Sequence, residues 1–198
     1  MYVWKMSQTL TEPIDPEWQK LLTLAFGDSV HPERKKSFLL SRIALQNCLK
    51  EQGLCLNPSE LVLNNHHEIT CAKQFTLSLS HSKNIGAALV ADRVSYRSVG
   101  IDVELKERIV KDSVCEKIAN PKDCALRNID LWCLKEAAFK TLMNTGLFDL
   151  PLTFSSITIA QDHWVHMPSK LFGQWELEIV RPFVVARAFL RNEKLFRP

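Results

Sequence analysis

Each half of this chain reads as one helix followed by a group of short strands, and this doubled order constrains the fold more than any other feature. The two segments with the apolar periodicity of a helix span about residues 32–52 and 129–144. The segments with strand patterns lie near residues 75–80, 85–91, 97–104, 155–160, 173–180 and 183–190. This order predicts an α+β fold of two similar halves, residues 1–105 and 106–198.

The overall composition is that of an ordinary globular protein. The chain has 198 residues, of which 46% are hydrophobic and 24% charged, enough for one or two domains with a sizeable core. The longest wholly apolar or glycine run, residues 85–91, is far shorter than the roughly 20 residues that a membrane span requires. The first residues, Met1 to Lys5, lack the apolar segment of a secretion signal. We therefore expect a cytoplasmic protein that does not associate with membranes.

Two carboxylates share one face of the strand expected near residues 97–104. Apolar residues alternate there with Gly100, Asp102 and Glu104, which is the period of a strand with one apolar face. Side chains at successive positions on one face lie roughly 7 Å apart along a strand, so two carboxylates can reach one cation from different sides. Gly100 beside them leaves room for a ligand. The pattern therefore indicates a candidate metal site.

The second expected helix carries a carboxylate and two lysines close together. Glu136 and Lys140 are four residues apart, so they are neighbours on the helix surface, and Lys135 lies beside them. A strand with two carboxylates and a helix with this set could hold a hard divalent cation, with a polyphosphate bridging metal and lysine.

Each of these motifs also has an ordinary interpretation. Taken alone, Asp102 and Glu104 read as the wet face of a half-exposed strand, and Glu136 with Lys140 as a common helix ion pair. Their joint occurrence with a third element, a strand that ends in a serine–histidine–serine turn at residues 80–82, favours a functional site.

Three motifs together resemble the 4′-phosphopantetheinyl transferase superfamily, in particular its single-chain, surfactin-synthetase-activating type. In chain order they are Ser80-His81-Ser82, Gly100-Ile101-Asp102-Val103-Glu104 and Trp132-x-x-Lys135-Glu136-Ala137-x-x-Lys140. The upstream segment Phe38-Leu39-Leu40-Ser41-Arg42 is similar to the family's Phe-x-x-Gly-Arg, with Ser41 in place of glycine. Leu150-Pro151-Leu152 is similar to the segment that follows the family's helix.

The resemblance implies both a fold and a reaction. The fold is a pseudo-dimer of two α+β halves with the active site in the cleft between them. The reaction transfers the 4′-phosphopantetheine group from coenzyme A to a serine of an apo acyl or peptidyl carrier protein, and it releases adenosine 3′,5′-bisphosphate. The expected metal is Mg²⁺, with Mn²⁺ as an alternative, and coenzyme A is the co-substrate.

The resemblance also assigns roles to individual residues. Asp102, Glu104 and Glu136 would bind the metal on the pyrophosphate. Lys140 would pair with the phosphate under attack, and Glu136 would act as the base that activates the serine, directly or through a metal-bound water. The residues expected to contact coenzyme A are His81, Ser80, Arg42, Lys36 and Lys135.

Positive charge is concentrated at two places in the chain, although the net charge is only +3. Residues 31–50 hold five Lys or Arg against one Glu, and residues 181–198 hold five against one. Because carrier proteins are acidic helical domains, such a basic surface favours a carrier as the partner. There is no arginine-rich run with interleaved aromatics, zinc finger or helix-turn-helix pattern, so nucleic acid is the weaker interpretation.

Two other functions fit the same residues. A Mg²⁺-dependent nucleotide pyrophosphatase would use the acidic cluster but pass the phosphate to water. A non-catalytic relative would only bind coenzyme A or a carrier protein. The complete set of Asp102, Glu104, Glu136 and Lys140 favours catalysis over binding alone.

Overall fold

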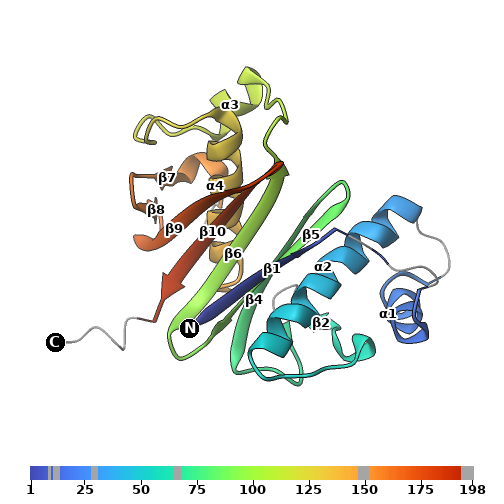
Figure 1. Cartoon of the computed structure of the whole chain (residues 1–198). Coiled ribbons are helices and arrows are strands. Elements are labelled where there is room, and N and C mark those ends of the chain that lie inside the picture. The colour runs from blue at the N-terminus through green and yellow to red at the C-terminus, as the bar shows by residue number, and fades with distance from the viewer. Residues whose placement is uncertain (9, 11–13, 28–30, 65–67, 147–151, 193–198) are drawn as a thin grey trace. The chain divides into compact units, whose positions relative to one another are not determined.

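The chain forms two compact units, Met1–Asp92 (unit 1) and Arg93–Pro198 (unit 2). The structure is a computed structural model, and it describes all residues except 9, 11–13, 28–30, 65–67, 147–151 and 193–198 (Figure 1). Both units combine helices with antiparallel strands, which confirms the α+β class. Within the described residues, no helix has the length and hydrophobicity needed to cross a membrane.

Unit 1 is a three-stranded sheet with one long helix packed on it. Its elements are β1 (Tyr2–Ser7), α1 (Pro16–Phe26), α2 (Pro32–Glu51), a 3₁₀ turn (Pro58–Glu60), β2 (Leu63–Asn64), β3 (Glu68–Ile69), β4 (Phe75–Ser82) and β5 (Ile85–Asp92). The strand order is β1-β5-β4, with antiparallel pairs, and β2 and β3 form a separate two-stranded ribbon. Helix α2 packs against β1, β4 and β5 and buries an apolar core that includes Leu45, Cys48 and Leu49.

Unit 2 is a five-stranded sheet with α4 packed on one face. Its elements are β6 (Tyr96–Leu105), α3 (Asp112–Ile118), α4 (Asn128–Met143), a 3₁₀ turn (Phe154–Ser156), β7 (Ile157–Ile159), β8 (His163–His166), β9 (Leu171–Val180) and β10 (Phe183–Arg191). The strand order is β6-β10-β9-β8-β7, and all neighbours are antiparallel. The core lies between α4 and the sheet and includes Leu134, Ala138 and Trp164.

The two units share the order of a helix and three strands at their cores. In each, a first strand is followed by two helices and later by a hairpin, and the first strand pairs with the last one. Thus β1, α2, β4 and β5 correspond in order to β6, α4, β9 and β10. The expected boundary at residue 105 is wrong, because β6 pairs with β10 and packs against α4, both in unit 2.

A glycine allows close contact between α2 and the sheet of unit 1. A Cβ built on Gly86 would lie 2.2 Å from the carbonyl carbon of Leu40 and from the nitrogen of Ser41. Gly86 is also the cross-strand partner of His81 at the end of the β4–β5 hairpin. The missing side chain therefore brings the backbone before Arg42 directly against the hairpin that carries His81.

Candidate functional site

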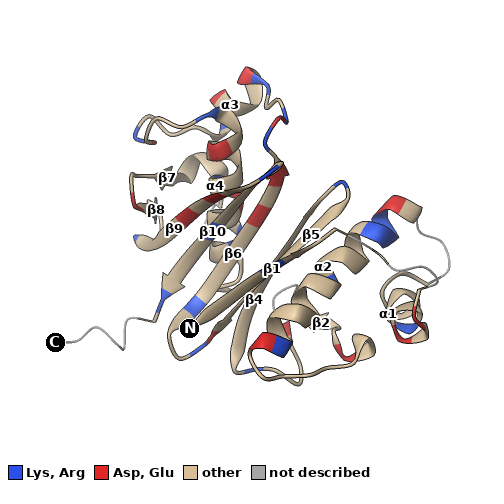
Figure 2. Cartoon of the chain, viewed as in Figure 1, with Lys and Arg blue, Asp and Glu red and all other residues tan. Residues whose placement is uncertain are grey.

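Two carboxylates of β6 face α4 within unit 2. Asp102 and Glu104 alternate with apolar residues as expected, but they are only 5% and 8% exposed. Gly100 on the same face lets the helix approach, because a Cβ there would lie 1.9 Å from the carbonyl oxygen of Ala137. The helix therefore covers this face and removes it from solvent, so the alternative of a wet strand face is wrong. Figure 2 shows the acidic part of β6.

Helix α4 presents three candidate site residues toward this strand. Cys133, Glu136 and Lys140 stand at positions i, i+3 and i+7, which lie on one face of a helix. Nζ of Lys140 donates to Oδ1 of Asp102 at 2.8 Å and to the carbonyl oxygen of Ile101 at 3.0 Å. Sγ of Cys133 donates to Oδ2 of Asp102 at 3.3 Å. The structure thus brings together two of the expected site residues, Asp102 and Lys140, and adds Cys133.

Glu136 lies half-buried between these two contacts. Burial raises the pKa of its carboxyl group, and the negative charge of Asp102 raises it further. The positive charges of Lys140 and Arg108 act in the opposite direction on this pKa. A carboxylate with a raised pKa is a stronger base than an exposed one, and this suits the general base expected at Glu136.

Arg108, which follows β6, is a charged residue of this cluster that the sequence motifs did not single out. Its guanidinium forms an ion pair with Glu104 and lies 5.5 Å from the ring centroid of Trp132. Because Trp132 and Glu136 are four apart on α4, this contact brings the guanidinium over the edge of the site. The signal in the sequence was weak, since it consists only of an arginine four residues after Glu104.

The donor set of this cluster is that of a hard divalent cation. Asp102, Glu104 and Glu136 offer only carboxylate oxygens, the ligands that Mg²⁺ prefers. In the described part of the chain, no three His, Cys, Asp or Glu side chains are grouped closely enough to hold a metal ion. Lys140 and Arg108 instead compensate the charge of Asp102 and Glu104. The carboxylates therefore fit Mg²⁺ by the chemistry of their oxygens, and a bound ion would share Asp102 with Lys140 and Glu104 with Arg108.

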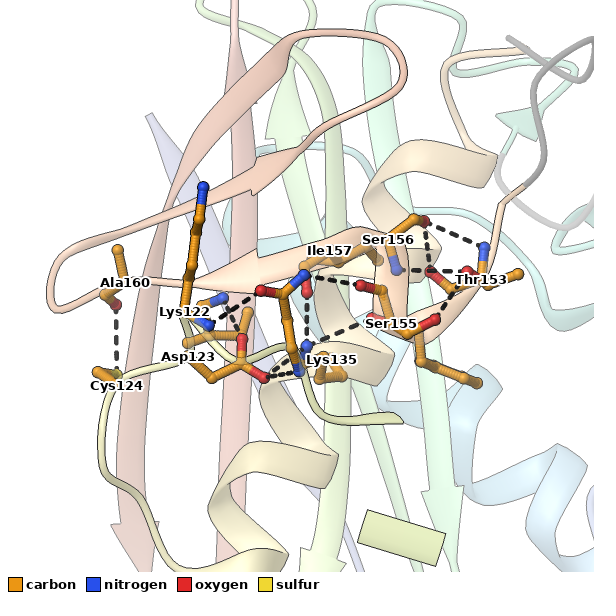
Figure 3. A network of polar contacts seen from close by, with 12 residues as sticks. Lys122, Asp123, Cys124, Lys135, Thr153, Ser155, Ser156, Ile157 and Ala160 are labelled. Carbon is orange, nitrogen blue, oxygen red and sulfur yellow. Dashed lines mark hydrogen bonds and ion pairs between the residues drawn. The ribbon is translucent and has the colours of Figure 1, made fainter. Parts of the chain in front are cut away.

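Lys135 does not fit the expected contact with coenzyme A. Its side chain is 0% exposed, and Nζ forms an ion pair with Asp123 at 2.8 Å. It also donates to the carbonyl oxygen of Phe154. Figure 3 shows its contacts with Asp123 and with the carbonyl oxygen of Ile157. Burial lowers the pKa of this lysine, and Asp123 opposes that shift. Lys135 is therefore an internal cation that joins α4 to the segments around residues 123 and 154–157.

Unit 1 contains a cavity of about 560 Å³ with mixed apolar and basic walls. Apolar side chains come from α1, α2, β4 and the β2 region, and basic ones come from α2. The lining residues are Leu21, Leu24, Ala25, Phe26, Arg34, Phe38, Ser41, Arg42, Val62, Leu63, Leu79 and His81. An apolar cavity with a few converging polar groups is typical of a small-molecule site.

Four of these side chains form a row in which aromatic rings separate two cations. The guanidinium of Arg34 lies 5.4 Å from the ring centroid of Phe26, and that of Arg42 lies 4.5 Å from Phe38. The two rings themselves meet edge to face with centroids 4.9 Å apart. These contacts hold both arginines in place without neutralising their charge.

Arg42 is the most unusual of these cations. Burial lowers the pKa of its guanidinium to about 10, so it still carries its charge at neutral pH. Its Nε is buried without a hydrogen-bond partner, and within the described ranges it forms no ion pair with a carboxylate. A partly buried cation of this kind, in the same cavity as His81, indicates a site for an anionic group.

Two other residues expected to contact coenzyme A are not placed beside His81. Ser80 is 6% exposed and, as the preceding residue on β4, points to the opposite face of the sheet. Lys36 donates from Nζ to Oδ1 of Asn84 at 2.7 Å and is not among the lining residues of the cavity. Arg34, which the sequence marked only as part of a basic cluster, contributes the second cation instead.

The comparisons with known proteins leave the family resemblance as a prediction. A scan against protein-family models and a search of curated proteins found no match to this chain. Part of one segment behind the resemblance, Leu150 with Pro151, lies outside the described residues. The features of the molecule that point to a function are therefore the surroundings of Asp102 in unit 2 and of Arg42 in unit 1.

Proposed function

We propose that this protein transfers the 4′-phosphopantetheine group of coenzyme A to a serine of an apo acyl or peptidyl carrier protein. The observation that carries the proposal is the α4–β6 contact, in which Lys140 binds Asp102 while Glu136 stands between Lys140 and Cys133 on the helix. A cation, a raised-pKa carboxylate and two buried carboxylates are the groups that substitution at a pyrophosphate requires.

In the proposed reaction the serine hydroxyl of the carrier attacks the phosphorus atom next to the pantetheine arm. Glu136 accepts the hydroxyl proton, a new phosphorus–oxygen bond forms to the serine, and the bond to adenosine 3′,5′-bisphosphate breaks. Lys140 stabilises the charge that develops on the phosphate oxygens. A Mg²⁺ ion held by Asp102, Glu104 and Glu136 would neutralise the pyrophosphate when bound.

We assign the nucleotide end of coenzyme A to the cavity of unit 1. The apolar wall with Phe26 and Phe38 suits an adenine ring, whereas Arg42 and His81 suit its 3′-phosphate. The shared order of elements in the two units supports the pseudo-dimeric fold of the transferase superfamily. That fold, its active site in the cleft between the halves, and a cytoplasmic location remain predictions.

Product analysis separates this function from the two alternatives. The experiment incubates the protein with coenzyme A and Mg²⁺, with and without an apo carrier protein, and follows adenosine 3′,5′-bisphosphate by chromatography. The transferase releases this product only when the carrier is present. Release together with free 4′-phosphopantetheine in the absence of a carrier would identify a pyrophosphatase, and bound but unchanged coenzyme A in both samples would identify a binding protein.

A further inference from the structure

We propose that Cys133 is a positioning residue, whose thiol holds the carboxylate of Asp102 in the orientation that binds the divalent cation. This inference rests on the proposed function, because it assumes that Asp102 is a metal ligand. Cys133 itself is 0% exposed, so it cannot touch a substrate or a metal-bound water from solvent. Its contribution must act through Asp102.

One helix holds both oxygens of the Asp102 carboxylate. Sγ of Cys133 donates to Oδ2 at 3.3 Å, and Nζ of Lys140 donates to Oδ1 at 2.8 Å. Because the two residues are seven positions apart on α4, they contact the carboxylate from points about 10 Å apart along the helix axis. The second acceptor near this thiol, the carbonyl oxygen of Val184, is more distant at 3.8 Å. The thiol and the lysine therefore contact different oxygens of the carboxylate and together restrict its rotation.

The thiol and the ammonium group affect Asp102 differently. Lys140 neutralises negative charge, and this competes with a metal ion for the same carboxylate. Cys133 is an uncharged and weak donor, so it fixes the direction of Oδ2 without reducing the charge of the carboxylate. Each carboxylate oxygen has more than one lone-pair direction, so Oδ2 can accept from the thiol and still face a cation.

The test compares metal binding by variants that differ in one donor. Calorimetry with Mn²⁺, without coenzyme A, gives the metal affinity of wild type, Cys133→Ala and Cys133→Ser. Alanine and serine are of similar size, but only serine can donate to Asp102. We expect Cys133→Ala to weaken Mn²⁺ binding by about tenfold, the lower end of what lost partners of metal ligands cost, and Cys133→Ser to stay within about twofold of wild type.

A third variant, a matched control and a transfer assay separate positioning from packing. Cys133→Val fills the space without a donor and should weaken Mn²⁺ binding as Cys133→Ala does, even if one of the two unfolds more easily. Cys48→Ala is the matched control, since Cys48 is also 0% exposed on a long helix and its Sγ lies 3.5 Å from a backbone carbonyl of β5. In transfer assays the Mg²⁺ concentration for half-maximal rate should rise in Cys133→Ala, with kcat at saturating Mg²⁺ little changed.

Several results would overturn the inference. Equal Mn²⁺ affinity in the alanine and serine variants would assign Cys133 to packing alone. Wild-type affinity in Cys133→Ala, with active transfer, would refute the role of Cys133 and leave the proposed function intact. A wild-type protein that binds neither Mn²⁺ nor Mg²⁺ would refute both, because Asp102 would then not be a metal ligand.

Discussion

Nζ of Lys140 lies 2.8 Å from Oδ1 of Asp102, so the cation of α4 is already held at the carboxylate face of β6. The bond to the carbonyl oxygen of Ile101 fixes it at a second point. This arrangement orders the lysine before any substrate is present. Less reorganisation is then needed when its charge stabilises a transition state.

Substitution of Lys140 should therefore reduce the rate more than the binding of coenzyme A. We expect Lys140→Met to lower kcat by about a hundredfold or more, as loss of a donor to a developing oxyanion does. The affinity for coenzyme A, measured by calorimetry, should fall by less than about tenfold, because the charge acts mainly in the transition state. An equal loss in both quantities would contradict the role assigned to Lys140.

Glu136 should reduce the stability of the metal-free protein at neutral pH. Its pKa is raised in the folded state, so the folded protein binds this proton more tightly than the unfolded chain does. The contribution of Glu136 to the free energy of unfolding is fully present below the ordinary pKa of a glutamate. It is lost as the pH rises through the raised pKa of the folded state. Glu136→Gln keeps the shape of the side chain but removes its ionisable carboxyl group, so this pH-dependent contribution disappears.

In EDTA we therefore expect Glu136→Gln to melt above wild type at about pH 7, by on the order of 2 °C, and to match it at about pH 4. Differential scanning calorimetry at both pH values provides the measurement. Asp162→Asn is a suitable control, because Asp162 is an exposed acid of unit 2 whose pKa is lowered by the hydrogen bond with His163. A wild type that is more stable than Glu136→Gln at neutral pH would show that the buried charge has a partner in the metal-free protein.

The buried pair Lys135 and Asp123 should contribute to folding and not to substrate contact. Lys135→Met leaves the carboxylate of Asp123, which is 6% exposed, without its cation. Removal of one member of a buried pair costs about 3–5 kcal/mol of unfolding free energy. Urea denaturation measures this loss, and the double variant Lys135→Met with Asp123→Leu should recover much of it.

Kinetics provide the control for that prediction. Under conditions in which the variant Lys135→Met is folded, its KM for coenzyme A should stay within about threefold of wild type, because the lysine is fully buried. A large rise in KM with little loss of stability would contradict this structural role. It would show that Lys135 contacts coenzyme A, as the sequence predicted.

Arg42 should bind the 3′-phosphate of coenzyme A. We expect Arg42→Ala to weaken binding of coenzyme A by about tenfold or more, and binding of 3′-dephospho-coenzyme A by less than about threefold. The ratio of the two affinities on one variant cancels any general effect on folding. Lys50→Ala, at the exposed end of the same helix, should leave this ratio unchanged. Equal losses of affinity for both ligands would show that the 3′-phosphate does not bind at Arg42.

Local patterns in the sequence predicted the elements that carry Asp102, Glu136 and His81. Period-two alternation identified β4 and β6, and helical periodicity identified α4 within one residue at each end. The spacing within each element also placed Asp102 with Glu104 and Glu136 with Lys140 on common faces. Such relations depend only on residues close in the chain, so they could be predicted from the sequence.

Long-range pairing was not readable in the same way. Strand β1 was missed because its partner β5 lies far along the chain, with Tyr2 opposite Ala91. The domain boundary was misplaced because β6 pairs with the distant strand β10. Lys135 appeared to be a surface residue because its partner Asp123 stands outside the helix, in a loop. The contact between Cys133 and Asp102 likewise joins separate elements, α4 and β6, so no local sequence pattern predicts it.

Helix α1 is a different case, because its signals were present. Asp15 caps the helix by accepting a hydrogen bond from the nitrogen of Glu17 at 2.8 Å, and Pro16 occupies the first turn. Apolar residues follow at helical spacing, namely Trp18, Leu21, Leu22, Ala25 and Phe26. Because this helix was overlooked, the apolar wall that it contributes to the cavity of unit 1 was overlooked as well.

The intact mass of an apo carrier protein, measured after incubation with this protein, coenzyme A and Mg²⁺, tests the proposed transfer most directly. We expect a mass gain of one phosphopantetheine group, no gain in the presence of EDTA, and a rate at least about a hundredfold lower for Glu136→Gln. The absence of any gain on several unrelated apo carriers, with binding of coenzyme A demonstrated, would contradict the proposed transferase function.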